Sequence, residues 1–224
     1  MLAIDTATTQ VVIASGSPAG VIDGLSTWTA GHRHGQHLLT SIGRFLSEQN
    51  IRRSRLAGIV VGTGPGAFTG MRVGIATAKG LAHGLALPLV GSPTSDALIT
   101  AAAEAASLEP SLLVLLVPAG PSDRIAARLG QPPRLLPGGT EPELAAADRL
   151  VALDLPGRAP DAALELGEVA RRGLGAALIR DGAARLATVE NRTGELAELV
   201  PSYVTLPRGV ASLGGTVTWS HDPR

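Results

Sequence analysis

Cysteine is absent from the 224-residue sequence, which excludes disulfide bonds and thiolate catalysis. Aromatic residues make up only 2% of the chain, so the core must be built from small aliphatic side chains. Long apolar runs are also missing, because stretches such as 112–118 are far too short to span a bilayer. The N-terminus, Met1-Leu2-Ala3-Ile4-Asp5, has no basic leader and is predicted to begin a strand. We therefore expect a cytoplasmic protein without a membrane segment.

An excess of charge of either sign is missing too, since 19 Lys and Arg residues balance 19 Asp and Glu residues. This balance argues against broad attraction to nucleic acid or anionic membranes, although it does not exclude a local basic patch. The apolar fraction of 45% is ordinary for a globular protein. The length fits one large domain or two small ones.

Residues 62–74 are the most informative stretch that is present. They read Gly-Thr-Gly-Pro-Gly-Ala-Phe-Thr-Gly-Met-Arg-Val-Gly and lie between an apolar strand (58–61) and a helix of small residues. Glycine permits close approach of the backbone to another group. That group is either an anion at the helix N-terminus or a helix packed very close. The signature loop itself comprises Gly64, Pro65, Gly66, Phe68 and Thr69.

Hydrophobic patterning predicts an ordered series of strands and helices before residue 107. Strands are expected at 2–6, 10–15, 21–27, 58–62 and 87–90, and helices at 36–49, 70–86 and 95–106. Leu38, Leu39, Ile42, Phe45 and Leu46 share one predicted apolar helix face. The first three strands should form an antiparallel meander, and the helical crossovers should make the later strands parallel. This order is that of the ribonuclease H-like unit, which actin-like proteins duplicate.

Residues after 108 are interpreted as a degraded second copy of the same unit. The expected elements are strands at 112–117 and 150–155, a hairpin partner at 124–129, a loop at 131–142, a short helix at 162–172 and a loose tail past 210. The predicted fold is thus an α/β, actin-like (ASKHA, ribonuclease H-like) protein of two lobes. Residues 1–107 form the first lobe and 108–224 a degenerate second lobe.

Three segments resemble the TsaB (YeaZ-like) family. Residues 2–7 are similar to the opening strand of that family, and Gly62 to Ala82 are similar to its G-x-G-P-G-S-F-T-G-x-R-x-G…A-K-G-L-A signature. Pro201-Ser202-Tyr203 resembles a Pro-x-Tyr motif near the C-terminus of the family, and 34–42 fits a His-Ser-Glu-x-L-L pattern loosely. In the second lobe, Pro118-Ala119-Gly120 replaces the usual Asp-Ala-Arg, and 124–126 replaces Glu-Val-Tyr.

This resemblance implies a non-catalytic subunit without cofactor or metal of its own. Such a subunit supports a TsaD-type enzyme, which moves a threonylcarbamoyl group to N6 of adenosine 37 in tRNA, and ATP belongs to a TsaE-type ATPase. It also implies a four-helix bundle, made from two helices of this chain and two of TsaD or of a second copy. We expect tRNA contact only within the complex.

A row of small residues supports such docking. Gly70, Gly74 and Ala78 recur every four residues, although an interior helical glycine costs roughly 1 kcal/mol relative to alanine. The smooth surface serves packing within the chain or, as we favour, docking onto another chain. The predicted partner-binding residues are His34, Leu38, Phe45, Gly70, Arg72, Gly74 and Ala78. Phe68 is expected to plug the space under the glycine loop, and Arg72 to hold loop carbonyls, a partner or a phosphate.

An enzymatic alternative rests on Asp5 and Thr6, which could form a phosphate site that is here interpreted as vestigial. An ATP-dependent transferase or phosphotransferase of the actin-like class needs a second phosphate loop, and no cluster of acid and glycine follows 112–117. A two-metal nuclease lacks carboxylates after strand 58–62. His32, His34 and His37 have no nearby acid to complete a metal site, and no peptidase constellation is apparent. No catalytic residue is predicted.

Overall fold

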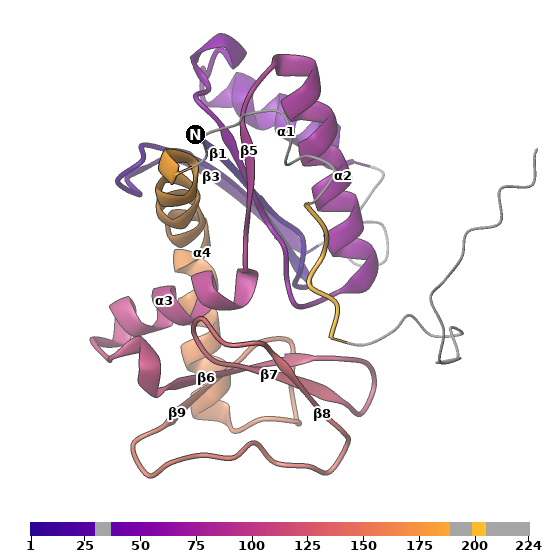
Figure 1. Ribbon diagram of the computed structural model, residues 1–224, viewed down its shortest axis with the longest axis vertical. Helices are drawn as coiled ribbons and strands as arrows, with labels where there is room; N and C mark the ends of the chain where they lie inside the picture. The colour runs from indigo at the N-terminus through magenta and orange to yellow at the C-terminus, as the bar shows by residue number, and fades with distance from the viewer. Residues whose placement is uncertain (30–36, 189–198, 205–224) are drawn as a thin grey trace, which may run out of the picture.

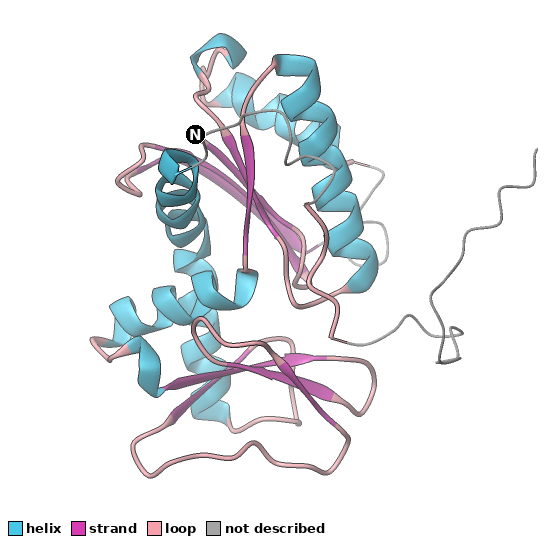
Figure 2. Cartoon of the chain, viewed as in Figure 1, coloured by secondary structure: helices cyan, strands magenta, loops and turns pink. Residues whose placement is uncertain are grey.

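A computed structural model of the chain describes residues 1–29, 37–188 and 199–204, and its strands form two sheets (Figures 1 and 2). The first sheet has the order β3-β2-β1-β4-β5. Its lobe contains β1 (Leu2–Asp5), β2 (Gln10–Gly16), β3 (Ile22–Thr29), α1 (Leu38–Glu48), the 3₁₀ turn η1 (Arg53–Arg55), β4 (Ile59–Gly62), α2 (Phe68–Leu85), β5 (Leu89–Ser92) and α3 (Thr94–Ala106). β1 to β3 are antiparallel, and β4 and β5 are parallel to β1. The predicted order and strand directions are confirmed.

The second sheet has the order β8-β7-β6-β9. After the 3₁₀ turn η2 (Pro110–Leu112), it contains β6 (Leu113–Pro118), β7 (Arg124–Ala127), β8 (Arg134–Leu136) and β9 (Arg149–Ala152), and α4 (Asp161–Thr188) follows. β6 and β7 are antiparallel, whereas β9 is parallel to β6. This sheet repeats the mixed strand pattern of the first in shorter form.

Two sequence-based predictions for this lobe are wrong. The expected loop at 131–142 contains β8, which is ordered by its antiparallel pairing with β7, a partner that local sequence does not reveal. The expected short helix at 162–172 is α4, which has 28 residues. Its glycines lower helix propensity, but they permit contacts with the rest of the fold that compensate. The predicted tail past 210 lies outside the described residues.

Successive side chains of the central strands point to opposite sides of the first sheet, and both of its faces are buried. Leu2 and Ile4 point to the side covered by α1 and α2, whereas Ala3 points to the side covered by α3 and α4 (Figure 1). Leu39 of α1 departs from its predicted apolar face, because it is 60% exposed while the other four residues of that face are buried. α1 therefore presents one large apolar side chain to the outside.

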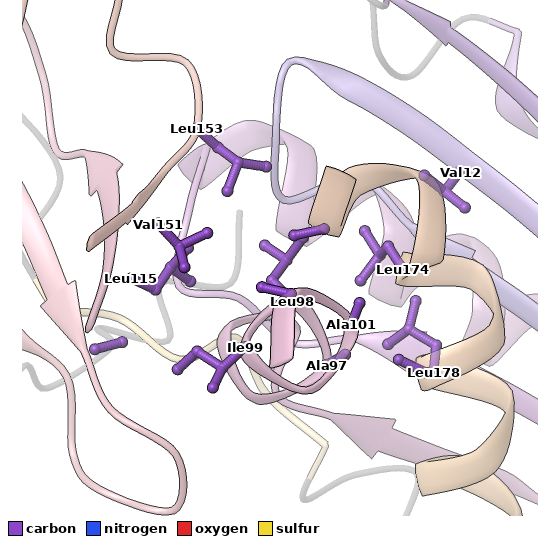
Figure 3. Close-up of a cluster of buried hydrophobic side chains, with 14 of the residues drawn as sticks. Val12, Ala97, Leu98, Ile99, Ala101, Leu115, Val151, Leu153, Leu174 and Leu178 are labelled. Carbon is purple, nitrogen blue, oxygen red and sulfur yellow. The ribbon is translucent and has the colours of Figure 1, made fainter. Parts of the chain in front are cut away.

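α3 and α4 join the two sheets in one hydrophobic cluster (Figure 3). Leu98 of α3 and Leu174 of α4 lie between Val12 of the first sheet and Leu115 of the second. The predicted boundary near residue 108 falls between α3 and β6 and stays a prediction, since this cluster draws on both sides of it. α4 is buried along one side but carries many charges, and no described helix is both long and apolar enough to cross a membrane.

Glycines of α4 allow this helix to pack closely against the sheets, whereas some glycines of α2 face open space. A Cβ at Gly167 would collide with the carbonyl oxygen of Ala152, whereas a Cβ at Gly80 of α2 would enter open space. We expect Gly167→Ala to lower the free energy of unfolding by about 1–2 kcal/mol, because overpacking outweighs the gain in helix propensity. Gly80→Ala should raise it by about 0.5–1 kcal/mol. Urea denaturation of both variants measures this, and equal signs would contradict the packing described.

Candidate functional site

The first turn of α2 lies directly against the turn between β1 and β2. The N–H of Ala67 donates to the carbonyl oxygen of Ala7 (2.7 Å), and the Thr6 hydroxyl donates to the carbonyl oxygen of Gly70 (2.7 Å). A Cβ at Gly70 would collide with the Thr6 carbonyl oxygen, and one at Gly74 with the Thr6 hydroxyl. The close approach that these glycines permit is therefore intramolecular, and it fills the space in which Thr6 was predicted to hold a phosphate.

Asp5 precedes Thr6 and is buried on the side of the first sheet that faces α3. Its side chain is fully buried, accepts a hydrogen bond from the Thr94 hydroxyl (2.6 Å) and accepts another from the N–H of Ala7 (3.0 Å). The Thr94 hydroxyl in turn accepts a hydrogen bond from the N–H of Gly64 (3.0 Å). Burial raises the pKa of Asp5 to about 6, against the opposing effect of these hydrogen bonds. The carboxyl group thus ties the ends of β1 and β4 to the start of α3 and is closed to an outside ligand.

The turn between β6 and β7 occupies the corresponding place in the second lobe. Arg158 donates from one guanidinium nitrogen to the carbonyl oxygens of Gly120 (3.0 Å) and Pro121 (2.9 Å). A phosphate loop presents N–H groups to its ligand. Here carbonyl oxygens converge on a cation, which is the opposite polarity, so this turn is not arranged to hold a phosphate.

A partly buried ion pair fastens the β1–β2 turn to the second lobe. Asp154, which follows β9, accepts hydrogen bonds from the N–H (2.9 Å) and hydroxyl (2.6 Å) of Thr9. Arg171 of α4 donates to Asp154 (2.8 Å) and to the hydroxyl of Thr8 (3.3 Å). Burial opposes ionisation of Asp154, but its bonds with Thr9 and Arg171 outweigh this effect and hold its pKa below the usual value. We call Thr9, Asp154 and Arg171 the interlobe clasp.

The clasp was not found from the sequence. Asp154 and Arg171 lie in separate elements, and neither belongs to a recognisable motif. Among the residues that the structure describes, no group of three or more His, Asp or Glu side chains is placed to hold a metal ion.

Most of the predicted partner-binding residues are inside the chain, which corrects their assignment to an outer surface. Leu38, Phe45, Gly70, Gly74 and Ala78 are buried in contacts between the helices, the first sheet and the β1–β2 turn. Arg72 is exposed, and His34 lies outside the described residues. Sequence periodicity identified small residues for close packing but did not show which side of α2 faces the sheet.

The outer side of α1 and α2 forms a shallow apolar surface instead. It is lined by Leu39 of α1 and by Ala76, Thr77, Gly80 and Leu81 of α2. The Cβ positions of Gly43, Gly80 and Gly84 open onto free space among the described residues. We call Leu39, Ala76, Thr77, Gly80 and Leu81 the α1–α2 face. An exposed apolar surface of this kind is typical of a protein contact.

The C-terminal Pro-x-Tyr segment lies beside the signature loop, where it runs along α2 in Figure 1. The N–H of Ser202 donates to the carbonyl oxygen of Thr63 (2.8 Å). The centres of the Tyr203 and Phe68 rings are 5.0 Å apart. The Nε of Arg72 donates a hydrogen bond to the Tyr203 hydroxyl (2.9 Å). Phe68 is therefore not a plug under the loop, because it is half-buried in a surface stack. Two motifs that are more than 100 residues apart in the sequence meet here.

Residues 22–198 match the family model described as TsaD: tRNA N6-adenosine threonylcarbamoyltransferase. The chain belongs to this family. The solved structure of YeaZ from Pseudomonas aeruginosa is 21% identical, with a TM-score of 0.67 over 90% of this chain and 98% of that one. This likeness shows the fold, and it confirms the predicted actin-like two-lobe class.

Curated relatives match mainly over shorter segments. An uncharacterized protein of Mycobacterium leprae is 36% identical over 107 residues, which are 44% of this chain and 28% of that protein. The tRNA threonylcarbamoyladenosine biosynthesis protein TsaB of Escherichia coli is 34% identical over 94 residues, which are 42% of this chain and 40% of that protein. The matched segments thus span less than half of these relatives. The resemblance to the TsaB (YeaZ-like) family is confirmed.

The raised pKa of Asp5 predicts a pH-dependent effect of Asp5→Asn. The native carboxyl group keeps its proton up to about pH 6, whereas the unfolded one loses it near pH 4. The stability that Asp5 contributes is thus present below pH 4 and lost as the pH rises through 6. Between about pH 4 and pH 8, the free energy of unfolding of the wild type should therefore fall relative to that of Asp5→Asn. We expect this difference to be on the order of 2–3 kcal/mol in favour of the variant. Denaturation at both pH values measures this, and a pH-independent difference would contradict the buried carboxyl group.

A substitution in the interlobe clasp should have a large effect on stability. Arg171 and Asp154 are 7% and 11% exposed, so Arg171→Met leaves a largely buried carboxylate without its cation. We expect the free energy of unfolding to fall by about 3 kcal/mol at neutral pH. The loss should shrink in acid, where protonation of Asp154 removes its charge.

The exposed pair between Arg44 and Glu48 offers a matched control for this experiment. Arg44→Met should leave the midpoint of urea denaturation nearly unchanged, because exposed pairs contribute little. Equal effects of the two variants would show that the clasp does not hold the lobes together.

Proposed function

We propose that this chain is a non-catalytic subunit that binds a TsaD-type enzyme through the α1–α2 face. It supports the transfer of a threonylcarbamoyl group to N6 of adenosine 37 in tRNA. The single observation that carries the proposal is the smooth apolar surface of Leu39, Ala76, Thr77, Gly80 and Leu81 on the outside of the first lobe. The names printed for the matching family and for its TsaB relatives support the choice of pathway.

The shape of this face suits a pair of helices. Gly80 and Ala76 follow each other on one side of α2, so another helix can approach closely without displacing large side chains. Leu39 is 60% exposed and would lose most of its contact with water on binding. A second copy of this chain could use the same surface, and self-association is therefore measured alongside the enzyme.

The interior of the first lobe supports a role other than catalysis. Asp5, the acid on which an ATP-dependent transferase would depend, is fully buried and hydrogen-bonded to Thr94. ATP chemistry is accordingly assigned to a TsaE-type ATPase. We propose that the tRNA is bound as part of the assembled complex.

Co-purification with the TsaD homologue of the same organism tests the proposal. Ala76 is an exposed alanine on the α1–α2 face, and Ala105 is an exposed alanine on α3. We expect Ala76→Arg to weaken the complex about tenfold or more, since it places a long charged side chain in the contact. The matched variant Ala105→Arg should bind as the wild type does.

Both substitutions lie on exposed helix positions, so both variants should fold, and circular dichroism checks this. Failure of the wild-type chain to bind the TsaD homologue would refute the proposed function. Equal binding by both variants would keep the partnership but place the contact elsewhere. Loss of self-association alone in Ala76→Arg would identify the face as a homodimer contact.

A further inference from the structure

The stack of Phe68, Arg72 and Tyr203 is a preorganised group on the surface of the first lobe. The guanidinium carbon of Arg72 lies 4.3 Å from the centre of the Phe68 ring and 5.9 Å from that of Tyr203. The hydrogen bond from Arg72 to the Tyr203 hydroxyl fixes the two side chains relative to each other. We call these three residues the aromatic–arginine platform.

The platform is accessible despite these contacts. Tyr203 is 44% exposed and Arg72 is exposed, whereas Phe68 is half-buried beneath them. The segment that carries Tyr203 is anchored by the bond from Ser202 to Thr63 and by Leu199, which packs into the core beside Gly91. An exposed aromatic side chain is thus held in one orientation, which reduces the entropy lost when a flat ligand stacks on it.

Arg72 lies in a segment of the sequence that has no acidic residue, although the chain as a whole is neutral. Residues 49–95 contain no Asp or Glu, and they carry Arg52, Arg53, Arg55, Arg72 and Lys79. None of these five side chains forms an ion pair with a described residue. Residues 199–204 also contain no acid. Arg72 therefore has no carboxylate partner among the described residues.

We propose that the aromatic–arginine platform binds RNA directly, by stacking an unpaired base on Tyr203 while Arg72 contacts an adjacent phosphate. Single-stranded RNA is recognised by bases stacked on aromatic rings and on guanidinium planes, with cations along the backbone. An acidic protein would satisfy the charge but has no need of the exposed ring face. The combination of an exposed aromatic side chain and the unpaired Arg72 therefore favours RNA.

Fluorescence anisotropy of the full chain with two labelled RNAs tests this inference. The probes are a short oligouridylate and a blunt RNA duplex of the same length, at low salt. We expect the wild type to prefer the single strand, and Tyr203→Ala to weaken that binding roughly 5- to 150-fold. Tyr203→Phe keeps the ring and should bind nearly as the wild type does. Val200→Ala, at an exposed position of the same segment, is the matched control.

Salt dependence tests the role assigned to Arg72. We expect Arg72→Gln to reduce the slope of log affinity against log salt by about 0.7, the value for one contact to a single-stranded phosphate. Arg134→Gln removes an exposed arginine of the second lobe that forms no ion pair with a described residue, and it should leave the slope unchanged.

Several outcomes would overturn the inference. These are equal binding of single strand and duplex by the wild type, no loss in Tyr203→Ala, or an equal loss in Tyr203→Phe. Because Tyr203→Ala could also release its segment, photocross-linking of the wild type to 5-iodouracil RNA gives an independent readout. We expect the adduct on Tyr203 or Phe68, and adducts only elsewhere would refute the platform. These RNA-binding experiments contain no TsaD homologue. A negative result in them would therefore not contradict the proposed docking to TsaD.

Discussion

The contact between the β1–β2 turn and the first turns of α2 is the constraint on which the other features of this molecule depend. Gly70 and Gly74 bring α2 so close to Thr6 that no side chain fits between them. This closeness sets the direction in which α2 leaves the signature loop. It therefore decides which residues of α2 face the sheet and which remain outside.

The glycines of this chain have two distinct roles that depend on the side of the helix they occupy. On the inner side, Gly70 and Gly74 permit backbone contact within the chain, and Gly167 does the same in α4. On the outer side, Gly80 and Gly84 face open space and leave the helix surface smooth. The inner glycines stabilise the fold despite their low helix propensity, whereas the outer ones lower the stability of the isolated chain. Such a cost is understandable if the outer surface is used for binding.

Groups of the chain itself occupy the corresponding turns of the two lobes. In the first lobe the possible phosphate site is filled by Thr6 and the start of α2, and in the second the turn is occupied by Arg158. The interlobe clasp then joins the β1–β2 turn to Asp154 across the region between them. The fold alone therefore assigns no nucleotide site to this chain, because function depends on the site and not on the fold. The α1–α2 face and the aromatic–arginine platform both lie on the outside of the first lobe.

Local patterns determined much of this fold. Hydrophobic alternation and helical periodicity gave the order of elements to residue 106 and the strand directions, because those signals depend on neighbouring residues. They failed at β8, which is ordered by pairing with β7, and at the C-terminal half of α4, whose glycines are favourable only against the sheets. The glycine-rich signature likewise predicted a close approach without naming the group approached.

The sequence by itself therefore determined the fold class, the family resemblance and the existence of a tightly packed signature loop. Only the tertiary structure decided that Gly70 and Gly74 face inward, that Leu39 faces outward, and that Tyr203 stacks on Phe68. It also brought together Asp154 and Arg171, which no motif connects. The reason is physical: periodicity encodes which residues share a side of an element, but contacts between distant segments depend on how complete elements pack.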